Sequence, residues 1–311
     1  MINSFKIAVI ISILSTISSC SRATQNSSDL GLFDISKNDQ YILFSIYSRQ
    51  NSSIYQIGTD GSGLTCIIPS TKDSNYFNPK YSKTVTKILF LACPKKDINN
   101  TAIYISNLDG SQKQKITTGN ENISEAFFSE CEDKIYYCKA NDYGHSSPLG
   151  TDQNHDVDIY SISLRDKKVE RVTNLKSYGI FAISEYDCRH ILMFVPVPNQ
   201  EGMTLVSKDS STLTVIDPVN NPKDDFGLYY NPKYSQKYNM LAFSAPHLLY
   251  IMSMANRNAK LVVNNVDHPN LADFRFFNNQ EKIIYTNEDE NTFYIVDFNG
   301  AMMKTILIKI K

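Results

Sequence analysis

Short, nearly continuous apolar runs recur along the chain, separated by polar stretches. Six of these runs resemble one another: residues 40–45, 87–92, 134–138, 190–195, 239–244 and 282–286. Runs of this length between polar turns are typical of β-strands that are buried on both faces. No pattern with a helical period interrupts the series. The pattern therefore predicts an all-β chain built from one repeated unit.

Two short motifs recur in phase with these runs. The first is an apolar or aromatic residue followed by Ser, at 35–36, 81–82, 128–129, 183–184 and 234–235, with Phe276-Phe277 in sixth place. From one copy of this motif to the next, the second residue moves along the chain by 46, 47, 55, 51 and 42 positions. The second motif is an apolar residue followed by Tyr, at 54–55, 103–104, 159–160, 249–250 and 293–294, with Met203-Thr204 in fourth place. Two motifs in phase indicate six copies of the unit.

Turn residues complete the unit. Asp60-Gly61, Asp109-Gly110 and Asn299-Gly300 follow the second motif, and such pairs are strong hairpin signals. The segments after these turns, such as 113–117 and 167–173, are rich in Lys and Arg, which protect an outer strand from edge pairing. Four strands in each of six units predict an all-β, six-bladed β-propeller of four-stranded antiparallel blades. The alternative is a β-sandwich with coincidental spacing.

The repeats resemble the WD40-like repeat of TolB-type propellers. The best copy is Thr101-Ala-Ile-Tyr-Ile-Ser-Asn-Leu-Asp-Gly110, continued by Ile116-Thr117, and the resemblance covers roughly residues 30–311. None of the six turns keeps the family's Pro-Asp-Gly, as Ser36-Lys-Asn-Asp39 illustrates, and we expect no counterpart of TolB's small α/β domain. The resemblance implies the fold and a cell-envelope location. It does not carry over the partners of TolB, because the same repeats occur in hydrolases and lyases.

The N-terminus predicts export. Lys6 precedes an apolar run at 7–17 that is too short to span a bilayer and has the length of a signal-peptide core. Ile17-Ser18-Ser19-Cys20 resembles the lipobox of bacterial lipoproteins, which implies lipidation of Cys20 and, with Ser21 next, outer-membrane sorting. The predicted organisation is a signal peptide at 1–19, a lipidated Cys and polar tether at 20–29, and the propeller at 30–311. An ordinary signal cleaved near Ser19 or Ala23 is the alternative.

The charge and cysteine content of the chain argue against nucleic-acid binding and against a structural zinc site. A formal net charge of -1 gives no general attraction to nucleic acid. Besides Cys20, five cysteines remain, at 66, 93, 131, 138 and 188, and an odd number in an exported chain cannot pair completely. We expect each to be a buried strand residue. A disulfide between Cys93 and Cys138 is the alternative for these two. Their spacing predicts no zinc site.

The predicted binding face lies at the end of the propeller that carries the longer loops. Strand direction alternates within a blade, so the loops from second to third strand and from fourth strand to the next blade share one end. An irregular loop at 139–157 and another at 218–230 are the longest, and loops usually carry binding residues. The candidate residues are Tyr143, His145, Asp152, His155, Asp156, Lys223, Asp224, Asp225 and His268. His247 belongs to the same end, so His145, His155 and His268 with nearby Asp residues allow a metal site, whereas ordinary solvated loops explain the same residues.

No nucleophile elbow, HExxH motif or P-loop is present, so we expect no catalytic residue and no cofactor. The prediction is a lipid-anchored envelope scaffold that binds a protein, peptide or glycan. The alternative is a metal-dependent lyase or hydrolase with its site at the loop-rich mouth of the propeller channel. Three of the loop histidines within ligand distance of one another would favour the alternative.

Overall fold

The computed structural model describes residues 28–119, 121–145, 152–196, 202–220, 229–245, 247–264, 271–288 and 290–309. Across these ranges the secondary structure consists of strands and turns. The described residues contain no helix that is long and apolar enough to cross a membrane.

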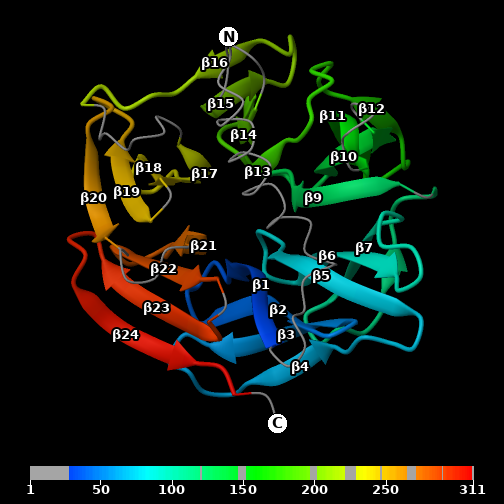
Figure 1. The fold of residues 1–311 in the computed structure, drawn as a ribbon, viewed down its shortest axis with the longest axis horizontal. Coiled ribbons are helices and arrows are strands. Elements are labelled where there is room, and N and C mark those ends of the chain that lie inside the picture. The colour runs from blue at the N-terminus through cyan, green and yellow to red at the C-terminus, as the bar shows by residue number, and fades with distance from the viewer. Residues whose placement is uncertain are drawn as a thin grey trace.

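The strands form six antiparallel sheets around a common axis, and each sheet is made of four consecutive strands (Figure 1). Blade 1 contains β1 (Ser28–Ile35), β2 (Tyr41–Ser48), β3 (Asn51–Gly58) and β4 (Thr65–Ile68); blade 2 contains β5 (Ser74–Tyr81), β6 (Lys87–Pro94), β7 (Ala102–Asn107) and β8 (Gln114–Lys115). Blade 3 contains β9 (Asn122–Phe128), β10 (Lys134–His145), β11 (Asp152–Ser163) and β12 (Val169–Arg171); blade 4 contains β13 (Phe181–Glu185), β14 (His190–Val195), β15 (Gly202–Ser207) and β16 (Leu213–Val215). Blade 5 contains β17 (Tyr230–Ser235), β18 (Met240–Ala245), β19 (Leu248–Ser253) and β20 (Ala259–Asn264); blade 6 contains β21 (Leu271–Phe276), β22 (Lys282–Asn287), β23 (Thr292–Asp297) and β24 (Met302–Leu307). The predicted six-bladed propeller is confirmed, and β1 begins two residues before the predicted start of the propeller at residue 30.

The six apolar runs form the second strands of the blades and are buried, as the pattern predicts. In five blades the Tyr of the second sequence motif stacks on an aromatic ring of its second strand: Phe44–Tyr55, Phe90–Tyr104, Tyr137–Tyr160, Phe243–Tyr250 and Tyr285–Tyr294. Blade 4 pairs Met193 with Thr204 at the same register position. Cross-strand aromatic pairs stabilise a sheet beyond the area that they bury. This pair explains why the motif recurs.

The predicted start of the fourth repeat was wrong by two residues. In other blades the backbone N–H at the motif's second residue donates across the turn, as from Ser36 to Tyr41 at 2.9 Å. In blade 4 the corresponding bond runs from Tyr186 to His190, at 3.1 Å. Tyr186, and not Ser184, is therefore the equivalent of Ser36, and the turn that follows it is one residue shorter; the Ile-Ser pair used for the prediction lies two positions earlier.

The two ends of the propeller differ as predicted, but the segment at 139–157 is not an irregular loop. Strands β10 and β11 extend through most of it as a regular antiparallel hairpin, in which Asp142 pairs with His155 and His145 with Asp152. The paired strands supply hydrogen bonds to a segment that the sequence pattern alone reads as polar loop.

Apolar clusters fill the spaces between blades and close the ring. Phe293 of blade 6 is fully buried and meets Phe33 and Phe44 of blade 1 edge to face, both with ring centroids 5.2 Å apart. Because every blade is formed from its own consecutive strands, no strand is shared between blades 1 and 6. Side-chain packing and turn contacts therefore hold the first and last blades together.

The expectation that each cysteine is a buried strand residue holds for Cys93 and Cys138 only. Cys66 lies on the outer strand β4 and is exposed, and Cys131 and Cys188 lie in exposed turns. No disulfide forms among the described cysteines. The expectation failed because outer strands and turns have no neighbouring sheet above them to bury a side chain.

Candidate functional site

Charged side chains from the innermost strands gather at the propeller axis. Six residues are equivalent by register, since each pairs with the second-strand residue just before the one that faces the Tyr or Thr of the second sequence motif: Asp34, Lys80, Phe127, Ser184, Lys233 and Arg275. Glu125 and Asp273 lie two residues earlier on β9 and β21 and so on the same side of their strands. We call Asp34, Lys80, Glu125, Lys233, Asp273 and Arg275 the axial cluster.

A break in register on every innermost strand shapes this region. All six ladders between a first and a second strand are shifted within a few residues of the axial cluster. Asn78, Ala182 and Asn231 take positive φ at these breaks, of 49°, 55° and 52°. Bulges bend a strand and redirect its side chains, and they are common beside functional sites. Here they bring polar groups of neighbouring blades into contact.

One five-residue sequence occurs at two of the bulges. Asn-Pro-Lys-Tyr-Ser stands at 78–82 in blade 2 and again at 231–235 in blade 5. Blades 2 and 5 are three blades apart, so β5 and β17 face each other across the axis (Figure 1). The repeat places Lys80 and Lys233 at equivalent heights on opposite walls.

The two asparagines of this repeat both donate to the next blade, one to a backbone carbonyl and the other to a carboxylate. The side-chain amide of Asn78 donates to the carbonyl oxygen of Ser124 at 2.9 Å, and that of Asn231 donates to Oδ1 of Asp273 at 3.2 Å. The shared sequence therefore has a positioning role as well as supplying a lysine.

Each carboxylate of the axial cluster accepts at least one hydrogen bond. Glu125 accepts the backbone N–H groups of Ala182 and Ile183, at 2.8 and 3.1 Å, and thereby links blades 3 and 4. Asp273 forms an ion pair with Arg275 at 2.6 Å. Asp34 accepts the backbone N–H of Tyr81 at 2.9 Å. These bonds hold the negative charges in place.

The two lysines are less well satisfied. Lys233 Nζ lies 3.9 Å from the nearest carboxylate oxygen, on Asp273. Among the described residues, no hydrogen bond or ion pair reaches Lys80 Nζ. The side chains of Lys233 and Arg275 are 12% and 11% exposed and that of Asp34 is 23% exposed, so the cluster is in contact with solvent.

Burial and the proximity of these charged groups displace the pKa values of both lysines and of Asp273. Burial, together with the nearby Arg275 guanidinium, lowers the pKa of Lys233 from 10.5 to about 7, and the same two causes lower the pKa of Lys80. Burial opposes ionisation of Asp273, but Arg275, Lys233 and Lys80 hold its pKa below its ordinary value. Displaced pKa values in one cluster are a feature of functional sites.

Buried acceptors complete the site. Asn78 Oδ1, Ser184 Oγ and Asp273 Oδ2 are buried without a hydrogen-bond partner in the protein. Unpartnered buried polar atoms are rare in native proteins, and each needs an explanation. All three belong to the innermost strands, on or beside the axial cluster.

The candidate residues of the predicted binding face lie close together only in part. Tyr143 is 48% exposed on β10. The His155 ring bonds the carbonyl oxygen of Gly144 at 2.8 Å and packs edge to face on Tyr178. Asp156 lies 3.3 Å from Arg171, and Asp152 is exposed at the start of β11. Two residue pairs lie between the pair that contains His155 and the pair that contains His145 in the hairpin.

Other predicted residues fall outside what the structure describes. These are Cys20, Lys223, Asp224, Asp225, His268 and the side chain of His145. His247 is exposed at the turn before β19. Within the described part of the chain, no three His, Cys, Asp or Glu side chains are grouped to hold a metal ion.

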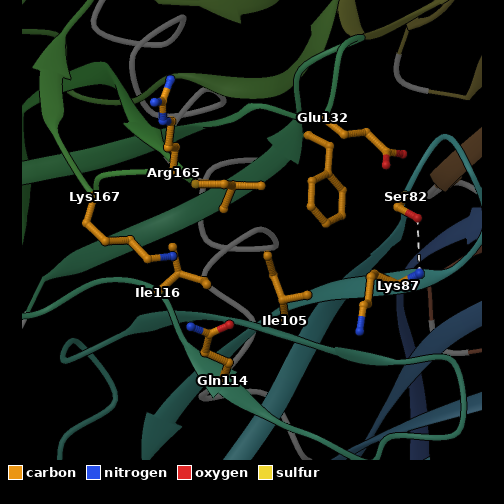
Figure 2. Close-up of a pocket in the computed structure, with 10 residues that line it drawn as sticks. Ser82, Lys87, Ile105, Gln114, Ile116, Glu132, Arg165 and Lys167 are labelled. Atoms are coloured by element: carbon orange, nitrogen blue, oxygen red, sulfur yellow. Dashed lines mark hydrogen bonds between the residues drawn. The ribbon is translucent and has the colours of Figure 1, made fainter.

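A depression of about 460 Å³ lies between blades 2 and 3, at the short-turn end (Figure 2). Ile105, Ile116, Phe128 and Leu164 line it with apolar surface, and Lys87, Arg165 and Lys167 stand around it. Lys87 is held by Asn107 at 2.6 Å. This depression lies at the end opposite the predicted binding face.

Sequence reasoning missed the axial cluster. It aligned the repeats on turns and apolar runs, and so treated the innermost strands only as spacers. The repeated Asn-Pro-Lys-Tyr-Ser was the available signal, because an identical pentapeptide is unusual among repeats that otherwise share only apolar and turn positions.

Comparison with known proteins supports the fold. No family model and no curated protein matches the chain. Among solved structures, TolB from Acinetobacter baumannii superposes with a TM-score of 0.62 at 13% identity, over 88% of this chain and 62% of that one. This chain therefore spans less than two thirds of the length of that TolB.

Two further structures are similar. A putative TolB from Agrobacterium tumefaciens gives a TM-score of 0.52 at 15% identity, over 76% of this chain and 81% of that one. An oligogalacturonate lyase solved in complex with manganese gives 0.58 at 8% identity, over 89% and 77%. Identities this low carry the fold and not the activity. In its fold, this chain is a TolB-like six-bladed β-propeller.

Proposed function

We propose that this chain is a lipid-anchored cell-envelope propeller that binds a protein, peptide or glycan ligand at its axis. The anchor is Cys20, and the expected location is the outer membrane, facing the periplasm. The observation that carries the binding role is the axial cluster, in which Lys233 has a 3.9 Å contact to Asp273 and Lys80 forms no hydrogen bond or ion pair with the described residues, although both side chains are partly exposed.

A purely structural role explains this cluster less well. Buried charges that only stabilise a fold are paired, because an unpaired charge in a low-dielectric site is costly. Glu125, Asp273 and Arg275 fit that description. Lys80 feels the charges of Asp34, Asp273 and Glu125 but forms no hydrogen bond or ion pair with the described residues, and a ligand that it contacts offsets the cost of its burial.

The proposed entry is the loop-rich end, where the β10–β11 hairpin projects. A photoreactive amino acid at Tyr143 tests this in intact cells. We expect it to capture a defined partner on illumination, whereas the same probe at Met302, on the outer strand of blade 6 and 53% exposed, captures nothing specific. Equal capture from both positions would contradict a specific site at that end.

A metal-dependent lyase or hydrolase is the competing proposal, and the likeness to the manganese-bound oligogalacturonate lyase motivates it. It needs metal ligands contributed by His145 or His268, since the described residues hold no group of three. Manganese titration of the purified protein separates the two proposals. Stoichiometric binding that is lost in His268→Ala favours the enzyme.

A further inference from the structure

The two lysine ammonium groups of the axial cluster form no hydrogen bond with its carboxylates among the described residues. Glu125 gives its two oxygens to backbone N–H groups, and Asp273 gives Oδ1 to Arg275 and Asn231. The ammonium groups of Lys80 and Lys233 each carry three donors. The nearest carboxylate contact to either is the 3.9 Å separation between Lys233 and Asp273.

The two ammonium groups also repel each other. They belong to opposite blades, and the charge of Lys80 is among the causes that lower the pKa of Lys233. Arg275 adds a third cation, but its guanidinium is held by Asp273 at 2.6 Å and by the carbonyl oxygen of Phe274 at 2.7 Å. A small anion between the two lysines relieves the repulsion and accepts hydrogen bonds from both ammonium groups at once.

We propose that the axial cluster binds a side-chain carboxylate of an acidic peptide segment, held between Lys80 and Lys233. This inference rests on the proposed binding function and names the chemistry of the ligand. The peptide enters from the loop-rich end, and its carboxylate accepts hydrogen bonds from both lysines.

The buried acceptors favour a peptide over an inorganic anion. Asn78 Oδ1 and Ser184 Oγ lack a partner in the protein and lie on the strands around the cluster. A peptide residue with a carboxylate also carries a backbone N–H a few bonds away, which Asn78 Oδ1 can accept. Phosphate at neutral pH offers mainly acceptors and leaves these atoms unsatisfied.

Isothermal titration calorimetry on the full chain in detergent tests the inference. The probes are an acetylated, amidated hexamer of Glu and the matching hexamer of Gln. We expect only the Glu hexamer to bind, and Lys80→Met or Lys233→Met to weaken it about 10- to 100-fold, as for the loss of a charged hydrogen bond. Lys115→Met, an exposed lysine on β8, removes the same charge and is expected to leave binding unchanged.

Proton uptake gives a readout on the unaltered protein, should a variant fail to fold. Lys233 is flanked by Arg275 and Asp273 of β21, Glu125 of β9 and Lys80 of β5. A bound carboxylate raises the pKa of Lys233 from about 7, so binding at pH 7.5 takes up protons from buffer. Titrations in buffers of different ionisation enthalpy measure this uptake.

Several results would overturn the inference. These are equal binding of the Gln hexamer, unchanged affinity in both lysine variants, absence of proton uptake, or displacement of the peptide by millimolar inorganic phosphate. Binding of a hexauronate in place of the Glu hexamer would reassign the carboxylate to a glycan and reject the peptide. None of these results affects the capture experiment at Tyr143. That experiment tests the binding role by itself, so its failure is distinguished from failure of the carboxylate inference.

Discussion

The carboxylate of Asp39 in blade 1 accepts the backbone N–H of Asn278 in blade 6, at 2.6 Å. It also accepts the N–H of Asn279 at 2.6 Å and is 4% exposed. Residues 239 positions apart in the chain thus meet at the short-turn end. With no strand shared between these blades, this contact is one of the polar links that close the ring.

Asp39→Ala tests the importance of that link. The substitution leaves two backbone N–H groups without their acceptor, so we expect a loss of about 1–3 kcal/mol in the free energy of unfolding. Urea unfolding followed by circular dichroism measures it. Asp209→Ala, in an exposed turn of blade 4, is the control and is expected to change stability by less than about 0.5 kcal/mol. Equal effects would show that Asn278 and Asn279 find other partners.

Phe293 tests the apolar part of the closure. It is fully buried between Phe33 and Phe44 of the first blade. Phe293→Ala leaves a cavity at this interface, and we expect it to cost about 3–5 kcal/mol. Met302→Ala on the same blade removes an exposed side chain and serves as the control. A small effect at Phe293 would mean that the ring is held mainly elsewhere.

The lowered pKa of Lys233 predicts how the free energy of unfolding depends on pH. Its pKa falls from 10.5 in the unfolded chain to about 7 in the folded protein, so between these values the unfolded chain binds more protons. Stability then rises with pH, and the contribution of Lys233 is most unfavourable below about pH 7. Chemical denaturation between pH 6 and 10 is expected to show a shallower rise in Lys233→Met than in the unaltered protein. Parallel curves would contradict a depressed pKa at this residue.

Thiol reactivity tests the cysteine environments. Cys131 and Cys188 lie in exposed turns, and we expect them to react first with a maleimide at pH 7.5. Cys66 follows, because burial of its thiol raises its pKa and so lowers the thiolate fraction. Cys138 is buried, with its pKa raised well above the ordinary value by burial, and reacts only on unfolding. Peptide mapping of the labelled sites decides the order, and a disulfide at Cys138 would refute it.

The lipid anchor is tested at Cys20. Cys20→Ala is expected to release the protein from membranes and to abolish fatty-acid labelling, because the Cys20 thiol carries the proposed lipid. Cys66→Ala is the matched control and leaves both unchanged. Retained labelling in Cys20→Ala would place the lipid elsewhere or reject lipidation.

The sequence by itself determined the six repeats. The apolar run of each blade is buried, and in five blades the Tyr of the second motif stacks on an aromatic ring of the adjacent strand, as Tyr55 does on Phe44. These are local patterns with a period, and the hairpin geometry follows from them. The one misplaced repeat, at Ser184, came from an Ile-Ser pair that lies two residues before the structural equivalent, Tyr186.

Only the tertiary structure decided where the charged groups meet. Lys80 and Lys233 are 153 positions apart in the sequence, and nothing local indicates that their ammonium groups interact. That depends on the ring closing with blades 2 and 5 opposite each other, and on a bulge in each inner strand that sets the direction of the side chains. Register and ring closure are long-range properties. The repeated Asn-Pro-Lys-Tyr-Ser could have pointed to the two lysines, but not to the carboxylates that surround them.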